Sequence, residues 1–327
     1  MNYVGALGRK LMRAENFNRF TGDLLGYPHP ITGEVSQAGK LNRINSEEGK
    51  LRFWENSVSS NYHALQLQVD RRYATGLAIR ANYTFAKSLD TRSTWHSGGS
   101  SSNRLQEGFS TDVLNQYLDY GRSVFDARHR FTLTWMWDIG WLTDSHSWFL
   151  RNVFGGWQAN GIVSLQSGQP FTPYCQRWVR CDWNGDGNIN DRPNTPDVGN
   201  SIQSERSDFT NPNAGIFEIP SSNPGSPPSL NDKLAYFGTP ESGKVGNLGR
   251  NTYEGPGYAG VDFSLLKEIG LSSINEEARL QLRFEAFNLF NRVNFFQPMN
   301  KINDEFFGRS KATFDAREIQ FGVKLIF

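Results

Sequence analysis

Near the end of the chain, residues Glu318 to Leu325 alternate strictly between apolar and polar side chains, and the chain ends on Phe327. Period-two alternation predicts a strand with one apolar and one polar face. Chain termini usually fray and carry polar residues, so a terminal strand that closes on an aromatic residue is unusual for a soluble domain. The apolar positions are Ile319, Phe321, Val323, Leu325 and Phe327, and the polar positions are Glu318, Gln320, Gly322 and Lys324.

Composition narrows the class of protein that this strand can belong to. The chain has 327 residues, a mean hydropathy of −0.56 and a formal net charge of +1. No stretch approaches the roughly 18 apolar residues that a transmembrane helix needs, which excludes a helical membrane protein and leaves β-barrels open. A barrel strand turns only alternate residues to lipid, so its hydropathy signal is weak. The near-zero charge predicts no nucleic-acid partner.

Seven further segments alternate in the same way and predict an all-β, antiparallel architecture of about eight strands. Most are close to the roughly 9–11 residues that a tilted strand needs to cross a bilayer. Their polar faces carry full charges, which a barrel can place in a water-filled lumen and a soluble sheet can place in solvent. The seven segments are Tyr3–Met12, Tyr62–Tyr73, Gly76–Lys87, Arg130–Gly140, Trp157–Gly168, Ala259–Ile269 and Arg279–Asn288.

The lengths of the connections favour a barrel over a soluble sandwich. If the last strand runs inward, every connection on the outer side is longer than every connection on the inner side. Short periplasmic turns and long external loops are typical of bacterial outer-membrane barrels. The inner connections are 74–75, 141–156 and 270–277, and the outer ones are 13–59, 88–129, 171–258 and 289–313.

Several stretches resemble known outer-membrane proteins. The terminal strand resembles the signal that such barrels present to the barrel assembly machinery, with Gln320, Gly322, Leu325 and Phe327 as its positions. Four internal stretches resemble TonB-dependent receptors, in particular the Oar-like (carboxypeptidase-regulatory-like) group. They are SNYHALQLQVDRRYATGLAIRANYTFAKSLD (60–90), YGRSVFDARHRFTLTW (120–135), FGGWQANGIVSLQSGQPFT (154–172) and LQLRFEAFNLFNRVNF (280–295).

The resemblance implies that residues 1–327 are a transmembrane β-barrel segment with long extracellular loops, forming the last third of a 22-strand barrel in the outer-membrane lipid. It also implies uptake of a large, scarce solute, powered by TonB through an N-terminal plug and coupling box. Because these parts and a signal peptide are not found in the sequence, we expect a truncated receptor. The alternatives are a self-contained eight-strand barrel, acting as an adhesin or structural protein, and a soluble all-β binding module.

One long outer connection contains the sequence DWNGDGNIND, residues 182–191. Oxygen ligands at positions one, three and five, followed by glycine at position six, match the start of a calcium-binding loop. Position twelve is Pro193 instead of a bidentate Glu, and Asp191 is the residue that can compensate. The alternative is a solvated turn cluster. The candidate ligands for a structural calcium ion are Asp182, Asn184, Asp186, Asn188 and Asp191; no cofactor is otherwise required.

The same connection holds the two cysteines, Cys175 and Cys181, which we expect to form a small disulfide because an exported location is oxidising. The alternative is two free thiols. Tyr174, Trp178 and Trp183 are candidates for stacking on a ligand, against the alternative of packing within the loop. The sequence contains no HExxH, GxSxG or phosphate-binding glycine loop, so we expect no enzymatic activity.

Overall fold

The computed structural model of the chain describes residues 1–21, 43–74, 76–94, 110–140, 145–175, 181–187, 191–196, 219, 221–271 and 278–327. Strands dominate these residues, and the helical elements are short. The long strands are β1 (Asn2–Asn16), β2 (Arg52–Ala74), β3 (Leu77–Asp90), β5 (His129–Ile139), β6 (Trp157–Gln166), β9 (Tyr258–Gly270), β10 (Arg279–Phe287) and β11 (Glu318–Ile326). The short elements are β4 (Gly121–Arg122), β7 (Pro170–Phe171), β8 (Tyr253–Glu254), η2 (Gln116–Asp119), α1 (Trp148–Phe154) and α2 (Leu230–Phe237).

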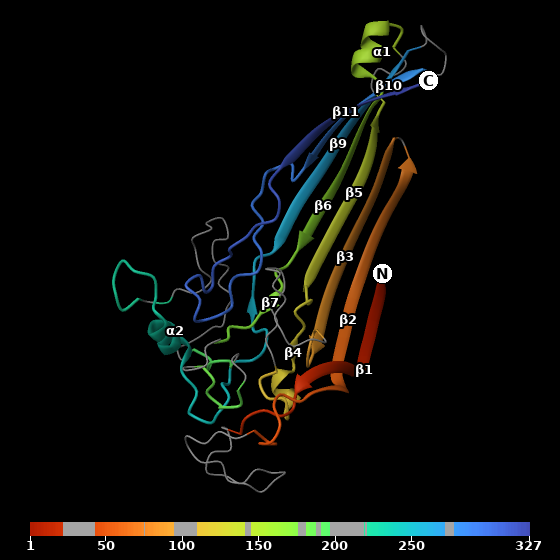
Figure 1. The fold of residues 1–327 in the computed structure, drawn as a ribbon. Coiled ribbons are helices and arrows are strands. Elements are labelled where there is room, and N and C mark those ends of the chain that lie inside the picture. The colour runs from red at the N-terminus through yellow and green to blue at the C-terminus, as the bar shows by residue number, and fades with distance from the viewer. Residues whose placement is uncertain are drawn as a thin grey trace.

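The long strands form one antiparallel sheet in sequence order, β1-β2-β3-β5-β6-β9-β10-β11, with β4 paired to the end of β3. Each of the eight predicted segments lies in this sheet, and β4 makes it nine-stranded, one more than the sequence predicts. The sheet does not close on itself in the described residues. Its free edges are β1 and β11, which lie at opposite sides of the sheet (Figure 1).

The register places most apolar side chains of the long strands on one face, because residues paired directly across neighbouring strands share a face. Where β5 meets β6, Trp135 lies opposite Gly161, and a Cβ at position 161 would come within 2.1 Å of the Trp135 ring. Glycine therefore makes room for an indole lying over the sheet. One row of this apolar face is Val69, Ala81, Leu133, Val163 and Val261, and the next is Ile79, Trp135, Gly161, Phe263, Ala286 and Ile319.

The connections sort by length as predicted. Those at one end of the sheet, 75–76, 140–156 and 271–278, are short, and those at the other end, 17–51, 91–128, 167–257 and 288–317, are long. We call these ends the short-loop end and the long-loop end. Figure 1 shows α1 and the C-terminus at the short-loop end and α2 among the long connections at the opposite end.

Two strand limits differ from the prediction by four residues or more. β1 continues to Asn16 instead of ending near Met12, and β2 begins at Arg52 instead of Tyr62. The extra residues pair in register, with Arg13 opposite Glu55, and those two side chains form an ion pair. Polar and charged residues occupy much of this extension, so it lacks the apolar alternation by which the other strands were recognised.

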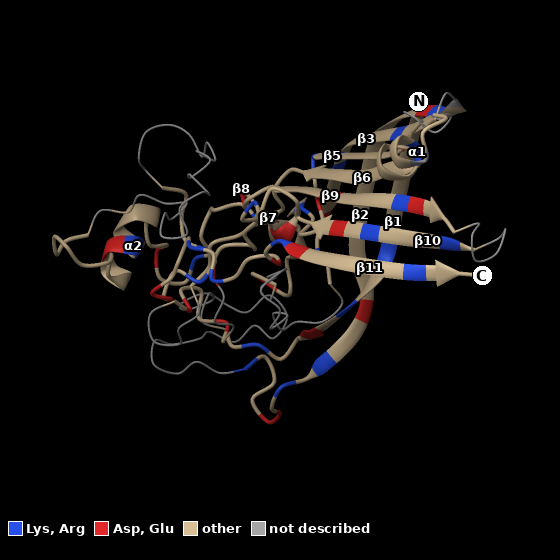
Figure 2. Cartoon of the chain, turned by 90° about the horizontal axis from the view of Figure 1, so that it is seen from above, with Lys and Arg blue, Asp and Glu red and all other residues tan. Residues whose placement is uncertain are grey.

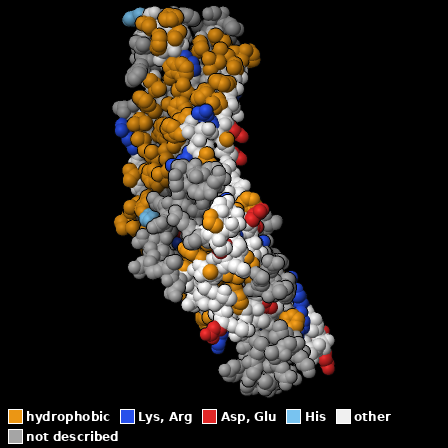
Figure 3. Space-filling view, turned by 90° about the vertical axis from the view of Figure 1, so that its left-hand side faces the viewer, with side chains coloured by type: hydrophobic (Ala, Val, Ile, Leu, Met, Phe, Trp, Pro, Cys, Tyr) orange, Lys and Arg blue, Asp and Glu red, His pale blue; other side chains and the backbone are white. Residues whose placement is uncertain are grey.

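Large apolar side chains remain exposed on the sheet. Phe321 of β11 is 79% exposed and Val323 is 73% exposed. Figure 3 shows hydrophobic side chains gathered over the upper half of the molecule, towards the short-loop end, while the lower half is mixed. A contiguous exposed apolar surface of this kind marks a surface that meets a lipid or a protein. Among the described residues, no helix has the length and apolar character needed to cross a membrane.

In the described residues, a buried hydrophobic cluster lies in the long connections rather than in the main sheet. Its members come from β7, α2, the segment between α2 and β8, β8, and the connection between β10 and β11. The helix α2 begins at a capping box, in which the Ser229 hydroxyl accepts from the Asp232 amide and the Asp232 carboxylate accepts from the Ser229 amide. The buried residues are Phe171, Phe237, Leu248, Tyr253, Ile302 and Phe307. The long connections thus build a small core of their own, which we call the loop core.

Candidate functional site

The face of the sheet opposite the apolar one carries paired charges. Arg80 Nε donates to Asp70 Oδ1 at 2.6 Å between β3 and β2. Asp138 of β5 accepts from Gln158 of β6 at 2.6 Å and from the Tyr73 hydroxyl. Cross-strand partners of this kind satisfy charged side chains without closing them off from water.

The same polar face continues across the C-terminal strands. Arg283 Nη1 lies 3.6 Å from Glu285 Oε1, both in β10. Gln281 Nε2 of β10 donates to Glu268 Oε1 of β9 at 3.1 Å. Figure 2 shows the bands of positive and negative residues along β9, β10 and β11. A sheet with one apolar face and one charged face matches the lipid face and the lumen face of a membrane barrel wall.

A second site is the layer of buried ion pairs that joins the long connections to the strand ends. Arg250 lies at its centre. Its Nη1 donates to the Asp90 carboxylate at 2.6 Å, to the Asp90 carbonyl at 3.0 Å and to the Asp119 carbonyl at 3.2 Å, while Nη2 donates to Ser93 Oγ at 2.8 Å. The side chains of Arg250 and Asp90 are 8% and 6% exposed, so water cannot replace either partner.

Two further pairs extend this ionic layer. Arg192 lies 3.3 Å from the Asp119 carboxylate and donates to the Leu118 carbonyl at 2.7 Å. Arg92 pairs with Glu15 at the end of β1, and Ser110 Oγ donates to the same carboxylate at 2.6 Å. Strand ends and long connections are therefore held by hydrogen-bonded charges, which is the arrangement that buried charges require.

The acidic loop, residues 181–187 and 191 of the described chain, brings three of the predicted calcium ligands together. One carboxylate oxygen each from Asp182, Asp186 and Asp191 lies within 4.8 Å of the other two. Asn184 is fully buried, and its Oδ1 accepts from the Asp186 amide at 3.1 Å. The fifth predicted ligand, Asn188, lies outside the described residues.

The three carboxylates are held close together in a buried site. Asp186 and Asp191 are each 1% exposed. Burial, reinforced by the negative charges of Asp186 and Asp182, raises the pKa of Asp191 to about 8, although the amides of Asn184 and Trp183 oppose the shift by donating to it. Burial also raises the pKa of Asp182, with the loop amides and the positive charge of Arg19 opposing the shift. These shifts show that burial outweighs the contacts that favour the charged form of the two carboxyls.

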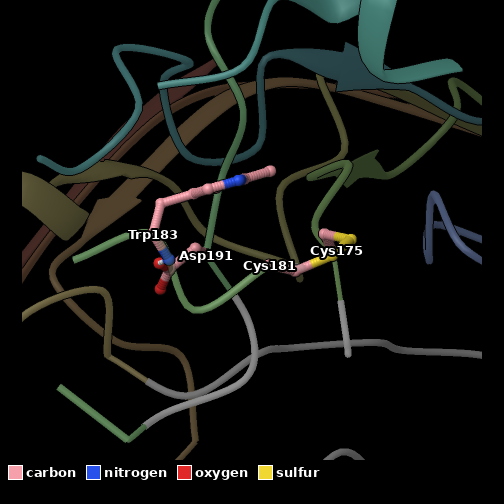
Figure 4. The surroundings of a disulfide bond; sticks show 4 residues. All are labelled: Cys175, Cys181, Trp183 and Asp191. Atoms are coloured by element: carbon pink, nitrogen blue, oxygen red, sulfur yellow. Dashed lines mark hydrogen bonds between the residues drawn. A yellow bond between two sulfur atoms is a disulfide. The ribbon is translucent and has the colours of Figure 1, made fainter. Parts of the chain in front are cut away.

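The sulfurs of Cys175 and Cys181 are joined in a disulfide, with their Cα atoms 5.4 Å apart. Both cysteines are fully buried, and the Cys175 amide donates to the Asp191 carbonyl at 2.9 Å, so the disulfide lies directly beside the acidic loop (Figure 4). The Cα distance is ordinary for a disulfide.

We expect this disulfide in the protein isolated from cells. Alkylation of the denatured protein without reductant should leave its mass unchanged, and alkylation after reduction should add two labels. The disulfide restricts the unfolded chain, and closing so short a ring stabilises the folded state by about 2 kcal/mol. Labelling of both cysteines without reductant would contradict the pairing.

The two described residues that the sequence predicts to stack on a ligand, Tyr174 and Trp183, differ in how far they are buried. Tyr174 is 7% exposed, and burial raises the pKa of its hydroxyl to about 12. Trp183 is half-buried, and its carbonyl accepts from the Gly243 amide at 2.8 Å. Trp178 lies outside the described residues. Of the described pair, only Trp183 therefore has an accessible surface, and its role in ligand contact stays a prediction.

Exposed aromatic side chains that the sequence reasoning did not single out lie next to η2. Tyr117 is 79% exposed, Phe125 is 52% exposed and Tyr120 is 45% exposed. The Tyr120 hydroxyl also accepts from Asn61 Nδ2 of β2 at 3.0 Å, which fixes it beside the strand end. The sequence offers only one indication that these aromatic residues are exposed, which is their position in a long outer connection. Many other residues share that position.

The four residues of the predicted assembly signal divide between the two faces of β11. Gln320 lies on the polar face and donates to Glu285 of β10, and Gly322 lies opposite Arg283. Leu325 lies on the apolar face, where it is 46% exposed, and Phe327, which follows the end of β11, is 79% exposed. Recognition by the assembly machinery stays a prediction.

Comparison with known families gives one match. A family model described as an outer membrane beta barrel domain matches residues 1–320, which is nearly the whole chain. No curated protein matches the sequence.

Proposed function

Because the chain belongs to the outer membrane beta barrel domain family, we propose that it forms part of the barrel wall of a TonB-dependent receptor that takes up a large, scarce solute. The protein is an outer-membrane protein, and its exposed apolar face lies against lipid. In this proposal, strands from outside the present sequence complete a 22-strand barrel, and TonB supplies the energy through a plug domain.

The observation that carries the proposal is that the connections at the two ends of the sheet differ in length and in packing. The connections at the short-loop end are short, whereas those at the long-loop end build the loop core and the ionic layer. A barrel that only anchors itself in the membrane has no need of a separately packed outer assembly. A receptor does need one, because ligands are bound by loops that a rigid scaffold positions.

The charged polar face supports a wide lumen. Asp70, Arg80, Arg283 and Glu285 all lie on it, and each is held in an ion pair with partners on the same face. Small eight-strand barrels have interiors just wide enough for side chains to fill, whereas large barrels enclose water or a plug. Long charged residues on a lumen face are therefore better suited to the larger barrel.

The two alternatives raised by the sequence are less well supported. The self-contained eight-strand barrel needs β1 to pair with β11, and the described residues contain no such pairing. The soluble binding module is wrong, because the family is one of outer-membrane barrels. Neither alternative explains the order of the receptor-like stretches along the chain.

Uptake measurements in cells test the proposal. Accumulation of labelled siderophores, oligosaccharides and peptides should be compared in wild-type cells, in cells lacking this gene and in cells lacking TonB. We expect the gene deletion to abolish uptake of one of these solutes, and we expect TonB deletion to abolish uptake of the same solute. Uptake that survives TonB deletion, or an unchanged uptake profile without the gene, would contradict the receptor function.

A further inference from the structure

We propose that the acidic loop binds a calcium ion through Asp182, Asp186 and Asp191, and that this ion fastens the long connections to the end of β1. The inference goes beyond solute uptake and does not depend on it, because the ion has a structural role in the outer assembly. It assigns a ligand class to a cluster that neither the ionic layer nor the loop core explains.

The first step is the geometry of the donor atoms. Oxygens from three carboxylates lie within 4.8 Å of one another. A calcium ion with ligand distances of about 2.3–2.6 Å fits at the centre of oxygens spaced in this way. The three residues fall at positions one, five and ten of the loop, so the sequence spacing and the folded geometry lead independently to the same cluster.

The second step is the unmet bonding capacity of two of these carboxylates, those of Asp191 and Asp182. Asp191 is 1% exposed, and its Oδ2 accepts from the amides of Trp183 and Asn184 at 2.7 and 3.3 Å. Its Oδ1 is buried and has no hydrogen-bond partner, and the same is true of Asp182 Oδ1. A buried carboxylate oxygen without a donor is costly. Two of them beside a third carboxylate favour a bound cation in addition to the positive charge of Arg19, which acts on Asp182.

The third step is the identity of the cation. All the donors are oxygen atoms, which hard cations such as calcium and magnesium prefer and which soft metals do not. The remaining coordination positions would be filled by backbone carbonyls or water, as is usual for calcium. Magnesium demands nearly ideal octahedral geometry and gives up its water reluctantly, so an irregular loop of this kind favours calcium.

The final step is what the ion would hold together. The Asp186 carbonyl accepts from the Phe20 amide, just after β1, at 2.9 Å. The Asn184 side chain donates to the Thr111 carbonyl, before η2, at 3.5 Å. The Asp191 carbonyl accepts from the amide of Cys175, next to the disulfide, at 2.9 Å. One ion would thereby tie three separate connections to the same point.

Calcium titration of the protein purified from outer membranes in detergent provides the test. Thermal unfolding and limited proteolysis should be followed in EDTA, in about 10 mM CaCl2 and in about 10 mM MgCl2. We expect a dissociation constant on the order of 0.1–1 mM, as in extracellular calcium modules. Calcium should therefore slow cleavage of the long connections by roughly 10- to 100-fold. Magnesium should have a much smaller effect.

The substitution Asp191→Asn separates ion binding from ordinary packing. Asparagine keeps an oxygen that can accept from the Trp183 and Asn184 amides and carries no negative charge, so we expect the variant in EDTA to be at least as protease-resistant as the wild type. The variant should gain no protection from calcium. Asp182→Asn, at a half-buried position, serves as a second variant if Asp191→Asn does not fold. Asp315→Asn, an exposed carboxylate in another long connection, is the matched control and should keep the full calcium response.

Two results would overturn the proposal. One is a wild-type protein that shows no heat of calcium binding by calorimetry and no calcium-dependent protection. The other is an Asp191→Asn variant with an undiminished calcium response, which would place the ion elsewhere. Either result leaves the receptor function standing, because solute uptake is measured separately in cells.

Discussion

Replacing Arg250 with alanine is expected to detach the long connections from the strand ends, at a cost of about 3–5 kcal/mol in the stability of that assembly. The substitution leaves Asp90 buried as a charge without its partner and removes the donors to the carbonyls of Asp90 and Asp119. Removing one partner of a buried pair costs far more than the net value of the pair. Limited proteolysis of the purified protein should show faster cleavage at the long-loop end.

The matched control is Arg80→Ala on the polar face of the sheet. Both arginines donate to an aspartate at 2.6 Å, but the Arg80 side chain is 62% exposed whereas that of Arg250 is 8% exposed. We expect the Arg80 substitution to cost about 0–1 kcal/mol, because water replaces an exposed partner. Equal effects of the two substitutions would contradict the role assigned to burial.

A double substitution distinguishes the loss of a partner from the loss of the pair itself. Asp90→Leu combined with Arg250→Met removes both charges, and the cost should be smaller than the sum of the two single substitutions. Replacing a buried ion pair by apolar residues of similar volume is often nearly neutral. Additive costs would indicate that the two residues act separately rather than as one unit.

The strands could be predicted because their signal is local. In β5, Phe131, Leu133 and Trp135 alternate with Thr132 and Thr134, and two-faced burial imposes that alternation within a single strand. The start of β2 was missed, because residues 52–61 pair with β1 through polar contacts. The helices α1 and α2 were also missed, since seven and eight residues are too few for a clear helical period.

The acidic loop and the ionic layer also differ in whether their residues lie close together in the sequence. The carboxylates that converge in the loop lie within ten residues of sequence, so their spacing alone predicted the cluster. Asp90 and Arg250 are 160 positions apart, and nothing in either neighbourhood indicates the other. Only the order of the strands brings them together, because both lie where the end of β3 meets the long connections.

Placing a lysine at Val163 is expected to reduce the amount of folded protein in the outer membrane severely, because this side chain lies in a central row of the apolar face. Val163 of β6 lies opposite Leu133 of β5 and Val261 of β9. A lysine on the lipid face near the bilayer midplane costs about 2–4 kcal/mol. Urea unfolding in lipid vesicles and abundance in the outer-membrane fraction both measure this effect.

The neighbouring substitution Ser164→Lys tests the direction of the two faces. Ser164 lies on the polar face, opposite Thr132 of β5 and Gly260 of β9, where a long charged side chain reaches a water-filled lumen. Its cost should stay within about 0.5 kcal/mol. Because the two positions are adjacent in one strand, their depth in the membrane is nearly the same. A larger loss from Ser164→Lys than from Val163→Lys would therefore show that the lumen and lipid faces are reversed, and that the charged face of this sheet does not line the barrel.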